Sequence, residues 1–483
     1  MQEPVDPSLD PTDWAVFRAQ SHRMLDDMLD YIEHIRQRPV WQPIPPALRA
    51  RFDEPLPHTA GSLPAAHQTF MNDILPYAVG NVHPGFMGWV HGGGSPVGMV
   101  AEMLAAGLNA NVGGRDQMPV EVERQIVRWM RELFGFPQTA GGVFVTGTSM
   151  ANLMSVLVAR TVALGTTVRQ DGVRHGDAQL VAYTSAAAHG CIAQAMDLSG
   201  LGTAALRRIA VNAQQQIDLG ALERAIAADR EAGLQPFFIA GTAGTVDIGA
   251  IDDLTALAAI AKREAIWFHV DGAYGALGML APDVAPLLAG IECADSLAFD
   301  FHKWGQVPYD AGFLLVRDAT HQLATFAAPV AYLRREVRGL AAGSPWPCDF
   351  GPDLSRGFRA LKTWFTIKVY GADQLGAVIS ETCRLARYLA AHVEAHPALE
   401  LLAPVALNIV CFRFRCADTD ADADHVNREI VADLHESGIA APSTTTVDGK
   451  LAIRAAIVNH RTGVQDIDAL LTAVLSFGAA RCA

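Results

Sequence analysis

Short apolar segments alternate with segments of helical periodicity between residues 85 and 375. The apolar segments carry almost no charge, as in AIWFHVDGA (265–273) and GFLLVR (312–317). Strands that are apolar on both faces are buried on both faces, which favours a largely parallel sheet covered by helices. The sequence therefore predicts an α/β domain with a mostly parallel central sheet.

The expected elements of this domain follow from periodicity, because helices repeat apolar residues every three to four positions and buried strands are short apolar runs. We predict helices over 119–135, 148–164, 218–232 and 252–264. We predict strands over 180–183, 208–211, 236–242, 265–273, 296–299 and 312–317.

Two smaller units flank this domain. Residues 1–84 combine an amphipathic helix over 12–37 with a proline-rich connector that cannot continue a helix. Such an arm cannot close a core alone, so we expect it to pack on a second subunit of a homodimer. Residues 376–483 are expected to form a small α+β unit. Its elements are a helix near 421–437 and strands over 408–415 and 450–459.

Charge and cysteine usage limit the possible partners and location. The formal net charge of −14 argues against nucleic acid or an anionic membrane surface as a partner. The start of the chain lacks the pattern of a signal peptide, and no apolar run reaches the roughly 18 residues of a membrane span. The seven cysteines form no CxxC pair, which predicts neither a disulfide framework nor a zinc site and favours a cytoplasmic location.

Ionisable residues stand where two of the expected strands end. AIWFHVDGA contains Asp271, followed by the small residues Gly272 and Ala273, and SLAFDFHKW ends with His302, Lys303 and a tryptophan. In open α/β sheets, ligands gather beyond the carboxyl ends of the strands. A structural Asp–Lys ion pair explains the two charges equally well, although such pairs add little stability.

Two further segments indicate a phosphate and a flat ring as ligand groups. In GGVFVTGTSMANL (141–153), a strand leads through Thr148 and Ser149 into a helix. A helix N-terminus with free N–H groups and hydroxyls binds phosphate well, whereas a plain helix cap is the simpler interpretation. His189 lies between a strand and a helix, where its ring can stack on a planar ligand or be structural.

Pyridoxal 5′-phosphate (PLP) requires four groups of this kind: a phosphate-binding helix N-terminus, a carboxylate, a ring that stacks on the cofactor and a lysine. A lysine amine can form a Schiff base with the aldehyde of PLP when the amine is neutral. A carboxylate on the pyridine nitrogen keeps that nitrogen protonated, so that the ring accepts electrons. These elements predict a PLP-dependent enzyme.

The chain resembles the fold-type I PLP enzymes and, more narrowly, the group II decarboxylases, the family of aromatic-L-amino-acid decarboxylase. The resemblance covers nearly the whole chain and implies a homodimer whose active sites borrow residues across the interface. It is carried by NVHPGFMGW (81–89), HVDGAYG (269–275), DFHKW (300–304), RGFRALKTWFTIKVYG (356–371) and LAIRAAIVNHRT (451–462).

This resemblance implies a role for each candidate residue. Lys303 carries PLP, Asp271 holds its ring nitrogen, and His189 stacks on the ring. The remaining cofactor contacts are Thr148 and Ser149 at the phosphate, His302 against the cofactor, and Thr245 and Ala273 beside it. The chain departs from the family's pattern at Phe301, and at Val246, where a second hydroxyl commonly follows the threonine.

The segment 327–346 carries the residue that the resemblance implies as proton donor, Tyr332. In the family, this tyrosine protonates Cα after CO₂ has left, and relatives that form aldehydes replace it by phenylalanine. Because the chain keeps Tyr332 and His189, simple decarboxylation to an amine is favoured. A PLP-dependent aldehyde synthase or aminotransferase is the alternative.

The stretch 81–112 is expected to line the pocket for the substrate side chain. Phe86, Met87 and Trp89 lie among glycines, an apolar and roomy lining suited to an aromatic amino acid. Arg115 and His91 keep an acidic substrate (glutamate, aspartate or cysteine sulfinate) as an alternative. A catalytically silent interaction protein is disfavoured because all the cofactor groups are present, and a dehydrogenase because the chain lacks a GxGxxG turn.

Overall fold

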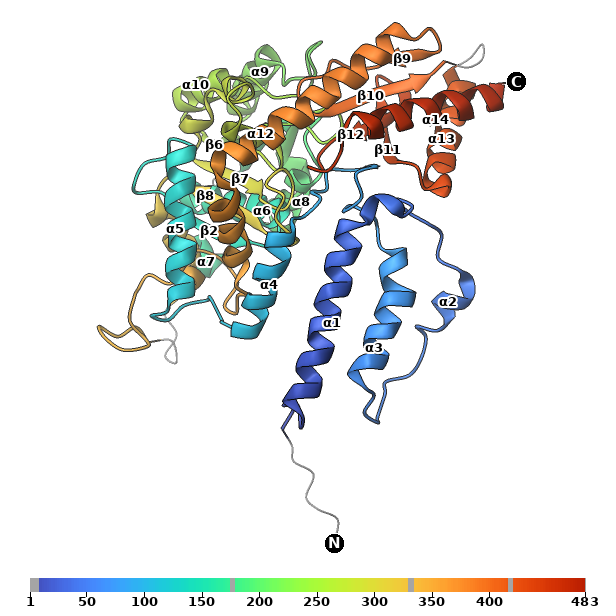
Figure 1. Ribbon diagram of the computed structural model, residues 1–483. Helices are drawn as coiled ribbons and strands as arrows, with labels where there is room; N and C mark the ends of the chain where they lie inside the picture. Colours follow the sequence, from blue (N-terminus) through green and yellow to red (C-terminus); the bar gives the residue numbers. More distant parts are fainter. Residues whose placement is uncertain (1–7, 174–178, 329–333, 416–419, 483) are drawn as a thin grey trace.

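The computed structural model describes residues 8–173, 179–328, 334–415 and 420–482 (Figure 1). Its larger sheet has seven strands in the order β2-β8-β7-β6-β5-β3-β4, and β8 alone runs antiparallel to its neighbours. This confirms the predicted mostly parallel sheet. The strands are β2 (Gly141–Val145), β3 (Leu180–Ser185), β4 (Leu206–Ile209), β5 (Gln235–Thr242), β6 (Trp267–Asp271), β7 (Ser296–Asp300) and β8 (Gly312–Val316).

Helices cover both faces of this sheet, as strands that are apolar over most of their length require. Successive residues of β2 illustrate the two faces: Val143 and Val145 belong to the apolar cluster of α6, whereas Phe144 belongs to the larger cluster that includes α5. The predicted helices are confirmed within a few residues. The helices of this domain are α4 (Pro96–Leu108), α5 (Met118–Leu133), α6 (Thr148–Leu164), α7 (Val168–Asp171), α8 (Cys191–Leu198), α9 (Leu219–Glu231), α10 (Leu254–Glu264) and α11 (Ala319–Phe326).

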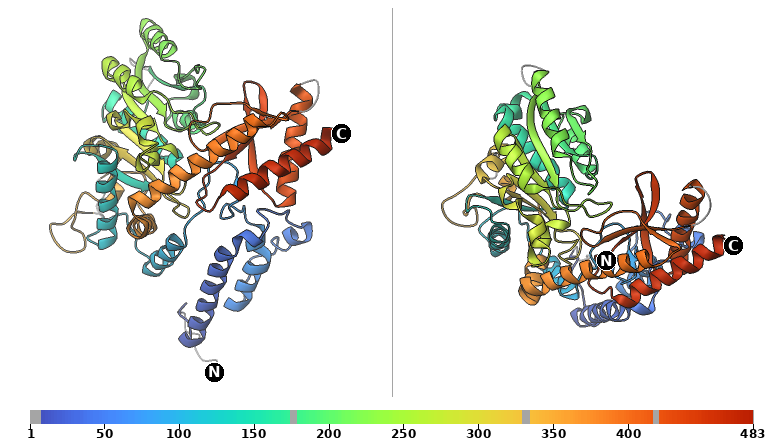
Figure 2. Two further views of the ribbon diagram at one scale, coloured as in Figure 1. Left: turned by 45° about the horizontal axis from the view of Figure 1, so that its top comes forward. Right: turned by 90° about the horizontal axis from the view of Figure 1, so that it is seen from above.

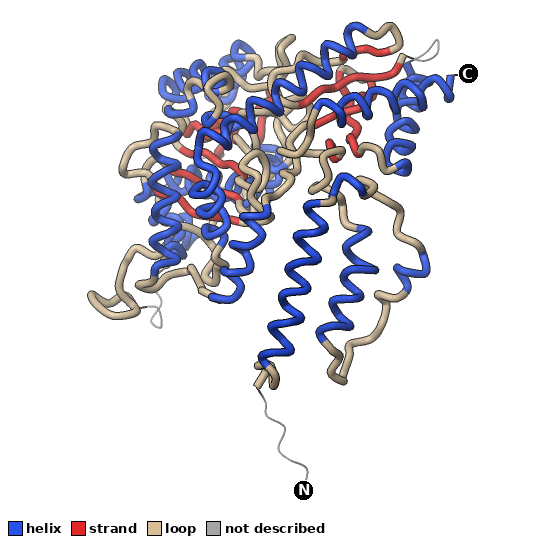
Figure 3. The backbone as a smooth tube through the Cα atoms, viewed as in Figure 1, coloured by secondary structure: helices blue, strands red, loops and turns tan. Residues whose placement is uncertain are grey.

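A second, five-stranded sheet lies towards the C-terminus, in the order β1-β11-β12-β10-β9 (Figure 3). The domain boundaries at 84/85 and 375/376 remain predictions. The structure links the predicted large domain to the C-terminal unit twice, because β1 joins the C-terminal sheet and α12 continues past residue 376. The elements are β1 (Phe86–Met87), α12 (Arg359–Ala395), β9 (Leu399–Leu401), β10 (Ile409–Phe414), α13 (Asp420–Ser437), β11 (Ala441–Val447), β12 (Lys450–Ala456) and α14 (Val464–Cys482).

The N-terminal arm contains α1 (Trp14–Glu33), α2 (Pro46–Ala50) and α3 (Leu63–Thr69). Helices α1 and α3 lie side by side and project from the rest of the chain (Figures 1 and 2). The helix expected over 12–37 is shorter than predicted, because the Asp13 carboxylate caps its N-terminus and a 3₁₀ turn replaces its last residues. Large apolar side chains of α1, including Trp14 and Phe17, are exposed.

Among the described helices, none is long and apolar enough to cross a membrane. Among the cysteines that the structure describes, five are free: Cys191, Cys293, Cys348, Cys383 and Cys411. Cys482 is disulfide-bonded, so the expectation of a chain without disulfides is wrong at this position.

A buried ion pair ties α5 to the segment before α12. Arg356 Nη2 lies 2.6 Å from Glu123 Oε1, and the guanidinium also donates to the carbonyls of Val112 and Phe144. Both charged side chains are almost fully buried. Their removal from water is compensated only while both partners are present.

We therefore expect Arg356→Met to lower the free energy of unfolding by about 3–5 kcal/mol, because Glu123 is left as an unpaired buried charge. Urea denaturation followed by circular dichroism measures the change. The control is Arg384→Met, which removes an exposed partner of Glu381 and should cost less than about 1 kcal/mol. Equal effects of the two substitutions would contradict this interpretation.

Candidate active site

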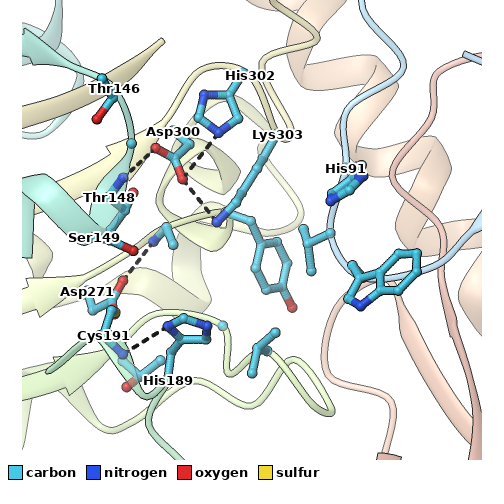
Figure 4. Close-up of a pocket in the computed structure, with 18 of the residues that line it drawn as sticks. His91, Thr146, Thr148, Ser149, His189, Cys191, Asp271, Asp300, His302 and Lys303 are labelled. Atoms are coloured by element: carbon cyan, nitrogen blue, oxygen red, sulfur yellow. Dashed lines mark hydrogen bonds and ion pairs between the residues drawn. The ribbon is translucent and has the colours of Figure 1, made fainter. Parts of the chain in front are cut away.

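A cavity of about 380 Å³ lies where β2, β3, β5, β6 and β7 end. The carboxyl ends of parallel strands meet at one edge of a sheet, so residues far apart in the sequence converge there. Seven of the predicted site residues line this cavity (Figure 4): Thr148, Ser149, His189, Asp271, Ala273, His302 and Lys303. The strand-end position predicted for the ionisable residues is thus confirmed.

Lys303 is paired with a carboxylate that the sequence analysis did not assign. Its Nζ lies 3.0 Å from Asp300 Oδ2, and Asp300 Oδ1 accepts a hydrogen bond of 2.8 Å from the Thr148 backbone N–H (Figure 4). Asp300 is the last residue of β7 and is buried. Lys303 therefore forms its ion pair with Asp300, three residues earlier in the chain. The alternative that Asp271 and Lys303 form a structural ion pair is not what the described residues show.

The ring of His302 is buried between Asp300 and the chain that follows. Its Nδ1 accepts a hydrogen bond of 3.0 Å from the Ala311 N–H, and its Nε2 lies 3.6 Å from Asp300 Oδ2. Burial lowers the pKa of His302 to about 4. The ring is therefore neutral at pH 7 with its proton on Nε2, facing the carboxylate.

The first turn of α6 points at the cavity with two hydroxyl residues, Thr148 and Ser149. The N-cap is Gly147, which has no side-chain cap, so the simpler interpretation of these hydroxyls as helix caps is wrong. Thr148 Oγ1 is buried and has no hydrogen-bond partner in the described structure. A helix N-terminus with an unpaired buried hydroxyl fits the phosphate of PLP, whose oxygens accept hydrogen bonds.

Asp271 ends β6 and is held by two N–H hydrogen bonds and by the Cys191 thiol, whose Sγ lies 3.8 Å from Oδ2. Its Oδ1 accepts from the Ala273 N–H at 3.2 Å, and its Oδ2 accepts from Asn152 Nδ2 at 3.0 Å. Burial raises the pKa of this carboxyl, and the charge of Lys303 and the two hydrogen bonds oppose that shift. A carboxylate oriented in this way fits the protonated pyridine nitrogen of PLP.

Behind Asp271 lies a chain of hydrogen bonds that the sequence analysis missed. Asn152 Oδ1 faces His269 Nε2 at 2.8 Å, and His269 Nδ1 faces Ser296 Oγ at 2.8 Å. Burial lowers the pKa of His269 to about 3, so its ring is neutral. Because Asn152 donates to the carboxylate, its oxygen must accept, which puts the imidazole proton on Nε2.

His189 lies on the loop between β3 and α8. Its Nδ1 accepts a hydrogen bond of 3.2 Å from the Cys191 N–H, which fixes the ring at the cavity (Figure 4). Burial raises the pKa of the Cys191 thiol to about 12, so this cavity residue stays protonated.

Two predicted site residues are not among those lining the cavity. Thr245 is buried in the turn after β5, where its hydroxyl accepts a hydrogen bond of 3.0 Å from the Ala250 N–H. In this structure Thr245 stabilises a turn, and its contact with the cofactor remains a prediction. Tyr332 lies outside the described residues. Val246, noted as a departure, does line the cavity, and Phe301 is buried among the aromatic rings of the sheet.

Arg454 connects the C-terminal sheet to the rim of the cavity. It lies on β12, is buried, and donates to the carbonyls of Trp89 (2.9 Å) and Asp247 (3.0 Å), and to that of Val246. The segments carrying Trp89 and Val246 are thereby held in place. The sequence contained a signal for this residue, an arginine inside the apolar run LAIRAAI, since a charge in a buried strand needs partners.

The chain matches the model of the pyridoxal-dependent decarboxylase conserved domain over residues 45–415. Aromatic-L-amino-acid decarboxylase from Bacillus atrophaeus is 32% identical over 93% of this chain and 93% of its own. Phenylacetaldehyde synthase from Arabidopsis thaliana is 29% identical over 93% of each chain. The crystal structure of Oryza sativa TDC with PLP and tryptamine shares the fold, with a TM-score of 0.90 and 24% identity over 99% of this chain and 100% of its own.

These matches agree with the geometry of the cavity, in which a strand-end lysine, a buried carboxylate and an unpaired hydroxyl at a helix N-terminus fit PLP. The family resemblance and the predicted fold are confirmed. The chain belongs to the pyridoxal-dependent decarboxylase family, and PLP is its cofactor.

Proposed function

We propose that this enzyme decarboxylates an aromatic L-amino acid to the corresponding amine and CO₂. The observation that carries the proposal is the lining of the cavity, where Trp89 and His91 form a stacked pair and Trp89, Val90 and Val246 supply apolar surface. Phe86 and Met87, which the sequence also predicted to line the pocket, are buried in β1 and are not among its lining residues. Such a lining suits a planar side chain. The names of the relatives that act on aromatic substrates support the same conclusion.

An acidic substrate is the second candidate, and the charges around the cavity disfavour it. A second carboxylate needs a fixed cation, yet among the described lining residues Lys303 is the only lysine or arginine. Arg115, which the sequence left as a possible partner, instead lies over the ring of Trp346 at 4.7 Å. Glutamate, aspartate and cysteine sulfinate should therefore be poor substrates.

PLP, when bound, supplies an electron sink for the electron pair released as CO₂ leaves. We assign its phosphate to the first turn of α6 with Thr148, its ring nitrogen to Asp271, and its ring face to His189. Lys303 binds the cofactor and then, as a free amine, moves protons at its Nζ. The Thr148 N–H holds the Asp300 carboxylate next to the lysine, and neutral His302 lies with its Nε2 3.6 Å from that carboxylate.

The experiment that tests the proposal is a substrate panel with CO₂ and amine measured together. We expect both products in equal amounts from at least one of dopa, tyrosine, tryptophan and 5-hydroxytryptophan. Rates with glutamate, aspartate and cysteine sulfinate should be far lower. A preference for an acidic substrate would overturn the aromatic assignment and leave the cofactor assignment intact. Ammonia with aldehyde as the main products would favour the aldehyde synthase alternative.

Replacing Tyr332 by phenylalanine tests the proposed proton donor to Cα. Loss of one hydroxyl should leave PLP binding and CO₂ release in place but slow protonation, and a positioned general acid is worth about 10²–10⁴-fold. Dioxygen then competes with protonation and oxidises the product to aldehyde and ammonia, with O₂ reduced to H₂O₂. The ratio of aldehyde to amine in air should therefore rise, as measured by chromatography of both products. If the variant forms amine as cleanly as the wild-type enzyme, Tyr332 is not the donor.

Replacing Asn152 by alanine tests the hydrogen bonds behind Asp271. Loss of one hydrogen bond to a buried charge should weaken PLP binding about 10- to 100-fold, as measured by fluorescence titration of the apoenzyme. The control is Asn427→Ala, which removes an equally buried asparagine that bonds to the Phe414 and Ala423 backbone of the C-terminal unit. Unchanged PLP affinity in the Asn152 variant would show that Asp271 is oriented by other groups.

The homodimer and the cytoplasmic location are also proposals. Exposed apolar side chains on α1 (Trp14, Phe17) and on α4 (Met103, Leu108) support a dimer, because isolated helices with apolar faces need a partner surface. Light scattering at micromolar concentration should give twice the mass of the chain, and a monomer with full activity would contradict this. For the location, the five free thiols favour a reducing compartment, and the disulfide of Cys482 counts against it.

A further inference from the structure

The cavity has a second half, on the side of Lys303 away from the groups assigned to the cofactor. Figure 4 shows His91 across Lys303 from Thr148, Ser149 and Asp271. With PLP held by the groups in the first half, a substrate bound next to Lys303 would place its side chain in this half. His91 is therefore placed to meet the substrate side chain.

The ring of His91 belongs to an aromatic wall formed with Phe86 and Trp89. The three ring centroids lie 5.6–6.1 Å apart with interplanar angles of 17–30°, so the rings are nearly parallel. Phe86 is buried in β1, and Trp89 is held at its carbonyl by Arg454. Rings stacked in this way restrict the orientation of the imidazole.

The position of His91 relative to Lys303 is also restricted by the backbone. A Cβ atom at Gly92 would lie 2.4 Å and 2.5 Å from the carbonyl oxygens of Lys303 and His302, so only glycine allows this approach. The Gly93 N–H donates to Gln306 Oε1 at 3.1 Å. The segment carrying His91 therefore packs directly on the turn that carries the lysine.

The polar edge of this imidazole is available to a ligand. Neither ring nitrogen of His91 has a hydrogen-bond partner within the described part of the chain. Burial lowers the pKa of His91, and the nearby Lys303 lowers it further, so the ring is neutral at pH 7. A neutral imidazole offers one N–H donor and one acceptor. Both suit a phenolic hydroxyl, which donates and accepts.

We propose that His91 binds a ring hydroxyl of the substrate, so that this enzyme prefers hydroxylated aromatic L-amino acids to their unsubstituted counterparts. The inference rests on the proposed aromatic decarboxylation. A substrate ring without a hydroxyl would displace the water at His91 and leave the imidazole without a hydrogen-bond partner. This loss raises the free energy of the complex. Discrimination of about 10- to 100-fold is expected from a single hydrogen bond of this kind.

The test compares L-tyrosine with L-phenylalanine, which differ by one hydroxyl. We expect kcat/KM of the wild-type enzyme to be at least about 10-fold higher for tyrosine. His91→Phe keeps the stacked wall and should bring the ratio close to one, mainly through a loss on tyrosine. His91→Gln keeps a donor and an acceptor and should retain part of the preference.

A control variant and a binding measurement distinguish His91 from its neighbour Tyr309 as the residue that binds the hydroxyl. Tyr309 also lines the cavity, edge-on to His91 at 5.8 Å, so Tyr309→Phe should leave the tyrosine-to-phenylalanine ratio above about 10. Collapse of the ratio in that variant alone would assign the hydroxyl to Tyr309 and overturn the proposal. Calorimetric binding of tyramine and phenethylamine to the holoenzyme should show the same preference and the same loss in His91→Phe.

The amine-binding arm separates failure of this inference from failure of the proposed function. If no aromatic amino acid releases CO₂ but tyramine binds more tightly than phenethylamine through His91, the proposed reaction is wrong and the role of His91 stands. If the wild-type enzyme decarboxylates phenylalanine as well as tyrosine, and binds both amines equally, the role of His91 is wrong and the reaction stands.

Discussion

Replacing Lys303 by alanine is expected to lower the rate of decarboxylation by at least about 10²–10⁴-fold, because the amine that holds the cofactor and exchanges protons next to it is lost. Lys303 is the only lysine or arginine among the described residues of the cavity, so no neighbouring amine can take its place. The fold should survive, because the side chain is partly exposed and has one ion-pair partner, Asp300. Single-turnover CO₂ release measures the effect.

The control for this substitution is Lys262→Ala, which removes an exposed lysine near the end of α10. It should leave both PLP content and turnover unchanged. A Lys303→Ala variant with more than about a tenth of the wild-type rate would contradict the assignment of Lys303 as the amine that holds the cofactor.

Asp271→Asn should retain the fold and lose most of the activity. The asparagine can still accept the Ala273 N–H, but it carries no negative charge to hold a proton on the pyridine nitrogen. Removing one preorganised electrostatic group typically costs about 10²–10³-fold in kcat. The absorbance of the bound cofactor between pH 6 and pH 9 should also change, since the charge next to its ring is gone.

A second buried carboxylate provides the control. Asp252 accepts hydrogen bonds from the Ile217 and Thr242 N–H groups close to the end of β5, and it does not line the cavity. Asp252→Asn should therefore lower the denaturation midpoint without changing the cofactor spectrum. If Asp271→Asn behaves like Asp252→Asn, the carboxylate of Asp271 is structural.

Local sequence patterns were sufficient to predict the residues at the strand ends. Apolar runs without charges define β6 and β7, and a charged residue directly after such a run must lie at the sheet edge, as Asp271 and Lys303 do. The same argument placed Thr148 at a helix N-terminus after β2. These predictions succeed because one strand and its following turn determine each position.

Contacts between distant segments could not be predicted in this way. Asn152 reaches Asp271 from α6, 119 positions earlier in the chain, and its sequence context is that of an ordinary helix residue. Asp300 was visible beside Lys303, but its pairing depends on how the turn after β7 folds back. For Thr245 the family resemblance implies a cofactor contact, whereas the structure shows its hydroxyl accepting a hydrogen bond within a local turn, a contact that its sequence context did not reveal.

The most direct measurement of the central claim, that Lys303 holds PLP in a decarboxylase site, is borohydride reduction of the holoenzyme followed by peptide mapping. Reduction fixes the cofactor to the amine that carries it. We expect one pyridoxyl group per chain, on the peptide that contains Lys303, and loss of CO₂ release in proportion to labelling. Label on another lysine, or full activity after complete reduction, would contradict the claim.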